Sequence, residues 1–98
     1  MMKAYELLLF TNPSIDEESR LAALKRVDAV IADANGTVDN VDEWGKRKLA
    51  YEIDGLAEGD YVLIDFHVDP EQIAEIDRVL RITDAVVRHM IVRRDDRD

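Results

Sequence analysis

The chain has 98 residues, of which 47 % are hydrophobic, and this length suits one domain with one modest core. Its formal net charge of -9 argues against non-specific binding to polyanions, but it is compatible with a local basic patch, because charges more than about 8 Å apart are largely screened at physiological ionic strength. The absence of cysteine excludes disulfides, thiolate metal sites and cysteine nucleophiles.

The N-terminal half predicts a strand and a helix. Residues 5–10 are almost continuously apolar and precede Asn12-Pro13, which is typical of a buried strand. Ser14 and Glu17 have the spacing of a capping box, so we expect a helix to start there and to end near Asn35-Gly36. Its apolar residues recur at spacings of three and four: Leu21, Leu24, Val27, Val30 or Ile31, and Ala34.

The rest of the chain predicts three strands and a second helix. Residues 37–53 are prone to form a strand, and Gly45 within them indicates a bulge or bend. Asp54-Gly55 and residues 58–60 mark a turn, after which residues 61–68 alternate as in a strand. Asp69-Pro70 begins a helix that ends near Ile82, and residues 86–92 form the last strand. Residues 94–98 form a short polar C-terminal tail with no means of packing.

The element order βαββαβ predicts an α+β, ferredoxin-like fold for residues 1–93. Both helices have one apolar stripe and can cover one face of a four-stranded antiparallel sheet with strand order 4-1-3-2. The first and third strands are the most apolar, as central strands are, whereas the second carries three cations, as a protected edge strand does.

The other face of this sheet would be left open. Strand alternation places apolar side chains and a histidine on it, and exposed apolar surface of this size tends to mark a partner surface. The residues that we expect there are Leu8, Phe10, Tyr61, Leu63 and His67, together with Arg88, Met90 and Val92 from the last strand.

Catalytic chemistry finds no support in the sequence. His67 and His89 lie on strands that the predicted order separates, so a shared metal site or base pair is not expected. Ser14 and Ser19 stand in an acidic setting at a helix start, where capping is the better account than nucleophilic catalysis. With no zinc-ligand spacing and no phosphate-binding glycine loop, we expect no enzyme activity, no metal and no cofactor.

The cations Lys46, Arg47 and Lys48 follow Trp44-Gly45 directly. They can be the solvated edge of a strand, or they can contact phosphates, since arginine can bind a phosphate or a base edge in two places. Trp44 and Tyr51 can equally close the helix-side core or stack on a base. Alternation sends Lys46 and Lys48 to one side of the strand and Arg47 to the other.

Several segments together resemble the bacterial small-subunit ribosomal protein six family, over nearly the whole chain. The most distinctive is residues 43–51, Glu-Trp-Gly-Lys-Arg-Lys-Leu-Ala-Tyr. Tyr5-Glu6, Asn12-Pro13, residues 59–63, Asp69-Pro70, residues 80–82 and residues 84–88 add to it. Glu52 follows Tyr51 where many relatives have proline.

The resemblance implies a structural component of the small ribosomal subunit, found in the cytoplasm on the ribosome. Such a protein binds the central domain of the small-subunit ribosomal RNA together with small-subunit ribosomal protein eighteen. By matched position, the RNA-binding or partner-binding cations are Lys46, Arg47, Lys48 and Arg88, with weaker matches at Arg93, Arg94 and Lys3. The resemblance also implies that the partner protein contacts the apolar face, which consists of Leu8, Phe10, Tyr61, Leu63, Met90 and Val92.

Two alternatives use the same open face. A homodimeric ferredoxin-like module could pair sheet faces and bind a small molecule, although no cofactor signature accompanies it. An isolated RNA-recognition domain would stack bases on its central strands, but residues 61–66 lack the basic and glycine start of that motif.

Overall fold

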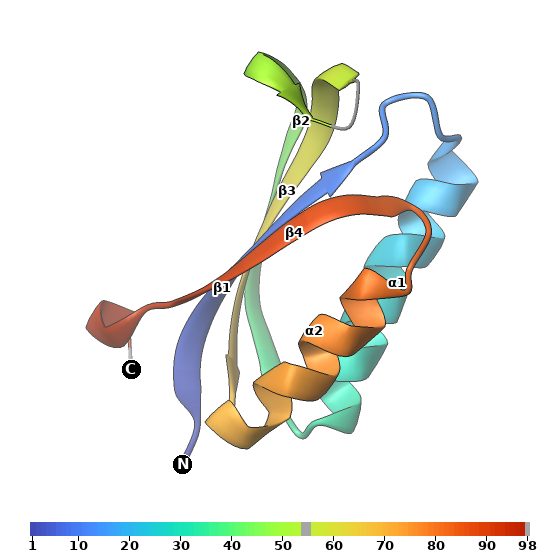
Figure 1. Cartoon of the computed structure of the whole chain (residues 1–98). Coiled ribbons are helices and arrows are strands. Elements are labelled where there is room, and N and C mark those ends of the chain that lie inside the picture. Colours follow the sequence, from blue (N-terminus) through green and yellow to red (C-terminus); the bar gives the residue numbers. More distant parts are fainter. Residues whose placement is uncertain (54–55, 98) are drawn as a thin grey trace.

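The computed structural model describes the backbone of residues 1–53 and 56–97 and the side chains of residues 1–48 and 58–97. The sheet is antiparallel with the order β2-β3-β1-β4, and both helices cover one of its faces (Figure 1). The predicted ferredoxin-like fold is therefore confirmed. Its elements are β1 (Lys3–Thr11), α1 (Glu17–Asp33), β2 (Thr37–Ile53), β3 (Leu56–Val68), the short 3₁₀ helix η1 (Pro70–Gln72), α2 (Ile73–Arg81), β4 (Val86–Arg93) and the short 3₁₀ helix η2 (Asp95–Arg97).

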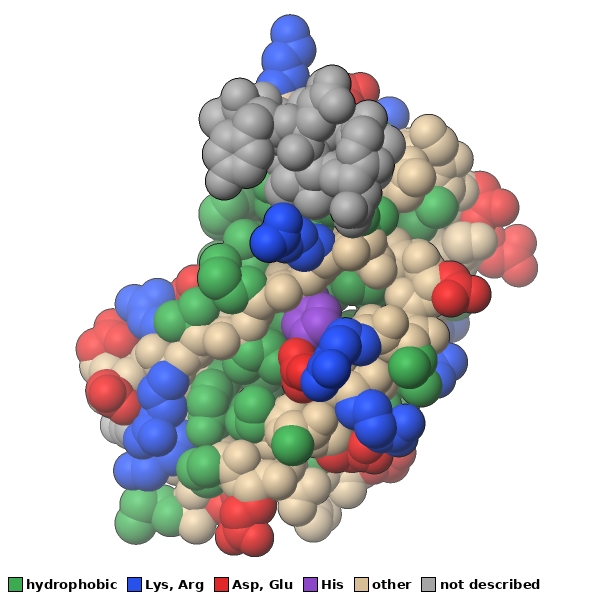
Figure 2. Space-filling view, viewed as in Figure 1, with side chains coloured by type: hydrophobic (Ala, Val, Ile, Leu, Met, Phe, Trp, Pro, Cys, Tyr) green, Lys and Arg blue, Asp and Glu red, His purple; other side chains and the backbone are tan. Residues whose placement is uncertain are grey.

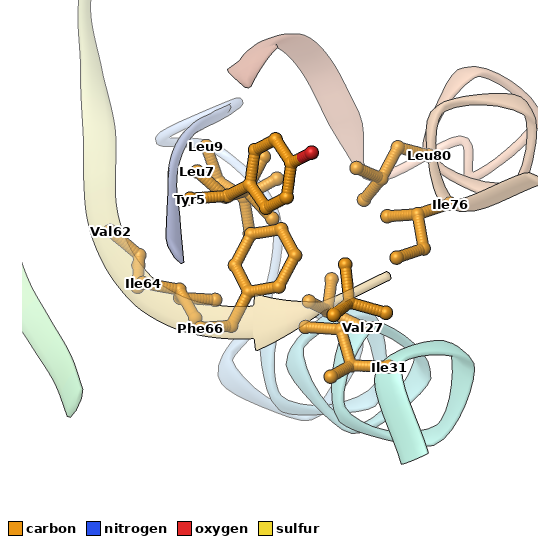
Figure 3. Packing of buried hydrophobic residues seen from close by; sticks show 11 residues of the cluster. Tyr5, Leu7, Leu9, Val27, Ile31, Val62, Ile64, Phe66, Ile76 and Leu80 are labelled. Carbon is orange, nitrogen blue, oxygen red and sulfur yellow. The ribbon is translucent and has the colours of Figure 1, made fainter. Parts of the chain in front are cut away.

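The core lies between the sheet and the two helices. β1 and β3 form its floor, because every second side chain of these strands points toward the helices. Tyr5 stacks on Phe66 with ring centroids 5.7 Å apart, and α1 and α2 close the core from the other side (Figure 3). Its buried residues include Leu7, Leu9, Val27, Ile31, Val62, Ile64, Ile76 and Leu80. Burial of each such side chain stabilises the fold by about 1.5–3 kcal/mol.

Helix α1 begins later than the capping box predicts. The Asp16 side chain, rather than that of Ser14, caps the helix by accepting a hydrogen bond of 2.7 Å from the Ser19 backbone N–H. Asn35 takes the positive φ, of 61°, that the sequence predicted for the helix end. Ala23 is buried, whereas Leu21, which was expected in the apolar stripe, is 46 % exposed.

The β2–β3 hairpin is longer than predicted. β3 begins at Leu56, so Glu58, Gly59 and Asp60 are strand residues paired with β2, and the expectation of a turn there is wrong. The turn signal Asp54-Gly55 lies outside the described residues. The bulge expected at Gly45 is confirmed, because the β2–β3 register shifts between Glu43 and Gly45 and Gly45 has a φ of 73°.

The C-terminal segment packs on the sheet over residues 94–97, contrary to the expectation of an unpacked tail. The Arg94 backbone N–H donates to the Ala4 carbonyl at 2.9 Å, and the following residues form η2. The guanidinium groups of Arg94 and Arg97 then reach carboxylates on the central strands. The sequence pattern shows only that these residues are polar, whereas the contacts that hold them come from residues about 30 to 90 positions away.

Candidate functional site

The open face of the sheet carries the apolar residues that alternation predicts. In the strand register Leu8 lies between Leu63 and Met90, and Phe10 lies between Tyr61 and Arg88. Val92 lies opposite Glu6 on the same face. Met90 and Val92 are 55 % and 40 % exposed, so β4 adds two neighbouring exposed apolar side chains to this face.

Phe10 lies on this face but adds almost nothing to its exposed area. Its side chain is only 3 % exposed, because the ring lies against Gly59 of β3. A Cβ at Gly59 would lie 2.2 Å from Phe10 Cε2, so the close approach requires glycine there. Phe10 also meets the edge of Tyr61, with ring centroids 5.2 Å apart. Phe10 therefore supports the partly exposed Tyr61 beside it.

The bulge in β2 brings Trp44 and Arg47 to the same face. These residues are three apart, so strict alternation would send their side chains to opposite faces. Trp44 is the extra residue, because Glu43 pairs with Val62 and Gly45 pairs with Tyr61, the next residue back along β3. Arg47 then pairs with Gly59 and points to the open face.

Trp44 and Arg47 line a groove on the open face, together with Leu8 and Tyr61. Its volume is about 520 Å³, and we call it the aromatic groove. Trp44 is 41 % exposed, and its ring centroid lies 6.1 Å from that of Tyr61. The indole Nε1–H donates to Asp42 Oδ2 at 2.9 Å, which orients the ring. Of the two roles left open for Trp44, closure of the helix-side core is therefore wrong; Tyr51 lies outside the residues with described side chains.

Most arginines of the described part of the chain are paired with carboxylates. Figure 2 shows basic and acidic side chains side by side over the helices and the C-terminal segment. The paired arginines are Arg20, Arg78, Arg81, Arg93, Arg94 and Arg97. Hydrogen bonds to Glu43, Glu75 and Asp96 raise the pKa of Arg20, Arg78 and Arg94 respectively, so these guanidinium groups are firmly charged and already engaged.

Among the described residues, the cations at the β2 bulge and at the start of β4 have no carboxylate within salt-bridge distance. Arg47 and Arg88 lie on the open face, on the outer strands of the sheet. Lys46 and Lys48 pair with Asp60 and Glu58 and point to the helix side. The structure therefore groups four of the predicted cations at one end of the sheet but divides them between its two faces.

The three weaker matches lie at the opposite end of the sheet. Lys3 pairs with Val68 near the start of β1. Arg93 contacts Asp95 at 3.0 Å and lies 6.0 Å from the Tyr5 ring centre. Arg94 contacts Glu6 at 2.7 Å. The predicted cations thus form two groups, and Arg93 and Arg94 already hold carboxylates of their own chain.

Two acidic residues on the open face were not predicted from the sequence. Glu6 and Asp65 lie opposite each other between β1 and β3, on the same side as Leu8 and Leu63. The alternation that selected Leu8, Leu63 and His67 places them on the same face. His67 lies nearby and contacts Asp39 and the Arg97 carbonyl oxygen. This end of the open face is polar and is covered by the C-terminal segment.

His89 lies on the helix side, away from His67. Its side chain is 11 % exposed and Nε2 lies 2.6 Å from Asp77 Oδ1 of α2. This contact, more than any other, holds the pKa of the Asp77 carboxyl below its usual value. Over the described ranges no cluster of three potential metal ligands occurs, and no described helix is both long and apolar enough to cross a membrane.

The comparisons with known proteins identify the family. The model of the family described as ribosomal protein S6 matches residues 4–93. The small ribosomal subunit protein bS6 of Clostridium botulinum (strain 657 / Type Ba4) is 53 % identical over 91 residues, which are 93 % of this chain and 97 % of that protein. The chain belongs to the ribosomal protein S6 family. The resemblance read from residues 43–51 and the other segments is therefore confirmed.

Further members of the ribosomal protein S6 family agree with this. The bS6 protein of Clostridium beijerinckii is 52 % identical over 91 residues, covering 93 % of this chain and 96 % of its own. The crystal structure of 30S ribosomal protein S6 from Thermotoga maritima superposes with a TM-score of 0.91 at 34 % identity, over 98 % of this chain and 91 % of that one. These relatives are named as ribosomal proteins, and functions in RNA binding and translation fit the ribosomal protein S6 family.

Proposed function

We propose that this protein binds the central domain of the small-subunit ribosomal RNA together with small-subunit ribosomal protein eighteen, as a structural and non-enzymatic component of the cytoplasmic ribosome. Residues 1–93 would act as one binding domain. One observation carries the proposal: among the described residues, cations without carboxylate partners gather at the end of the sheet where the open apolar face carries the exposed Trp44 and the partly exposed Tyr61.

The charge of the protein explains why a partner is needed. With a net charge of -9, the chain as a whole repels RNA, so Arg47 and Arg88 alone give weak affinity. A basic protein on the open face would cover Met90 and Val92, which are exposed, and would add cations of its own. Membership of the ribosomal protein S6 family supports this assignment.

The test is reconstitution from purified parts. The full chain, protein eighteen of the same organism and a transcribed central-domain fragment are mixed, and RNA binding is measured at several salt concentrations. We expect weak binding of the chain alone and much tighter binding with protein eighteen. The same salt-dependent affinity for the RNA with and without protein eighteen would contradict the proposal. A stable homodimer that binds neither the RNA nor protein eighteen would favour the small-molecule alternative.

Single substitutions then locate the phosphate contacts. Arg47→Gln and Arg88→Gln should each weaken RNA binding and reduce the salt slope by about one, as expected for one lost phosphate contact. Arg26→Gln is the matched control, because Arg26 is an exposed cation of α1 without an ion pair in the described structure and lies away from the open face. Equal effects of all three substitutions would indicate a general charge effect.

A further inference from the structure

The aromatic groove combines a planar apolar surface with a cation. On the basis of the proposed function, we propose that this groove binds one unpaired nucleotide of RNA, with the base against Trp44 and Tyr61 and a phosphate at Arg47. The inference is more specific than the proposed function, because it assigns the groove to RNA rather than to the protein partner. It also explains why the only tryptophan of the chain is exposed.

The aromatic surface is held in place before any ligand arrives. Phe10 is fixed against the backbone at Gly59, and its ring meets Tyr61 with centroids 5.2 Å apart. Tyr61 in turn lies 6.1 Å from Trp44, whose indole N–H is held by Asp42 at 2.9 Å. Rings that are already ordered lose little entropy when a base stacks on them.

Cations lie on both sides of these rings. Across one row of the sheet the order is Arg88, Phe10, Tyr61 and then the Trp44-Gly45 bulge. Three strand spacings make this row about 14 Å long. Arg47 lies two residues beyond the bulge on the same face. An RNA strand that follows the row would meet a guanidinium at each end of the aromatic surface.

The charges favour a nucleotide over a protein side chain in the groove. An apolar side chain could contact Trp44, but it would cover Arg47 without supplying a negative charge, and covering an unpaired charge is costly. A nucleotide supplies both a flat base and a phosphate. Among the described residues, Asp42 is the acidic residue bonded to Trp44, and its carboxylate already accepts the indole hydrogen bond. The volume of about 520 Å³ is large enough for a nucleotide.

Fluorescence of Trp44 tests the proposal directly, because it is the only tryptophan. The full chain is titrated at low salt with a six-nucleotide oligoadenylate and with an abasic strand of the same phosphate number. We expect the oligoadenylate to quench Trp44 and the abasic strand to leave its emission nearly unchanged. Equal quenching by both strands, or none by either up to millimolar concentrations, would overturn the assignment.

Arg47→Gln and Lys46→Gln form a matched pair for this titration. They remove one charge each from adjacent positions of β2, but only Arg47 lines the groove. We expect Arg47→Gln to weaken the binding of the oligoadenylate about fivefold or more. Lys46→Gln should have less than about half that effect, because it removes only the long-range attraction that both cations exert on the phosphates. If the two variants lose the same affinity, long-range attraction alone explains the binding and the proposed site is rejected.

The complete complex separates this inference from the proposed function. Trp44→Leu changes an exposed side chain outside the core, and circular dichroism checks that the variant folds. With protein eighteen present, we expect it to weaken binding of the central-domain fragment about tenfold while heterodimer formation is unchanged. If Trp44→Leu instead abolishes the heterodimer, the groove holds the protein, and the inference fails while the proposed function stands. If wild-type protein forms no complex at all, the proposed function fails.

Discussion

Glu6 and Asp65 lie directly opposite each other on the two central strands, and the guanidinium of Arg97 contacts both carboxylates. Its Nη1 lies 3.3 Å from Glu6 and 2.6 Å from Asp65. Arg94 adds a second contact to Glu6 at 2.7 Å. Like charges directly opposite in a sheet destabilise it, so the C-terminal segment neutralises a repulsion that the two strands would otherwise carry.

Arg97→Gln should therefore lower the free energy of unfolding by about 1 kcal/mol or less, since Arg97 and its two carboxylate partners are all partly exposed. The loss should shrink at high salt, where the repulsion is screened. Urea unfolding at two salt concentrations measures both effects. In a Glu6→Gln background the same substitution should cost much less, because only one carboxylate then needs a partner. A loss of the same size in both backgrounds would show that Arg97 does not act through Glu6.

Gly45 and Gly59 should respond differently to alanine. At Gly45 the space around a new Cβ is open, so Gly45→Ala should cost about 1 kcal/mol for the positive φ of 73° alone. At Gly59 the new Cβ would meet the Phe10 ring at 2.2 Å, and the resulting overpacking should cost about 1–3 kcal/mol. Chemical unfolding compares the two variants.

A smaller residue at position 10 tests the cause of the second effect. In a Phe10→Leu background the additional cost of Gly59→Ala should fall, because the ring that it meets is gone, whereas the cost of Gly45→Ala should stay the same. If Gly59→Ala instead costs the same stability with Phe10 and with Leu at position 10, the Phe10 ring moves aside freely. It then does not hold Tyr61 in place as we infer.

The layers of the fold could be predicted because they depend on local periodicity. Alternation in residues 61–68 and the stripe containing Val27 and Ile31 each record which side of an element faces the core. The strand order followed from the βαββαβ order of the elements, and the apolar character of the first and third strands agreed with it. The same alternation placed Leu8, Leu63 and Met90 correctly on the open face, because β1, β3 and β4 run without a bulge through these positions.

What could not be predicted depends on contacts between distant residues or on backbone geometry. Gly45 indicates a bulge, but only the pairing with Tyr61 shows that Trp44 is the extra residue and that it shares a face with Arg47. The burial of Phe10 depends on Gly59, which looks like a turn residue in the sequence. Two polar residues, Ser14 and Asp16, could each cap α1, and local spacing favoured the wrong one.

Two substitutions test which residue caps α1. Asp16→Ala removes the acceptor for the Ser19 N–H and a negative charge at the positive end of the helix dipole, so it should lower the urea midpoint. The hydrogen bond to Ser19 also lowers the pKa of the Asp16 carboxyl, so the cap should weaken as the pH falls below about 4. Ser14→Ala should leave the midpoint unchanged. A larger effect of Ser14→Ala would restore the capping box that the sequence suggested.

Asp77 should make the protein sensitive to acid. The contact with His89 at 2.6 Å, and then that with Arg81 at 2.5 Å, lower the pKa of this carboxyl. A carboxyl with a lowered pKa in the folded state contributes stability that is fully present above its unfolded pKa of about 3.9 and is lost as the pH falls through the folded pKa. Asp77→Asn should therefore be less stable than wild type at pH 7, and the difference should close below about pH 4.

Urea midpoints between pH 2 and pH 7 measure this difference. Asp28→Asn is the control, because Asp28 is an exposed carboxylate of α1 without a hydrogen bond or ion pair among the described residues. Its profile should run parallel to that of wild type, whereas the Asp77→Asn profile should converge with wild type in acid. If the Asp77→Asn profile also stays parallel, the carboxylate of Asp77 is not held by His89 and Arg81 in solution, and the link between α2 and β4 rests on apolar packing.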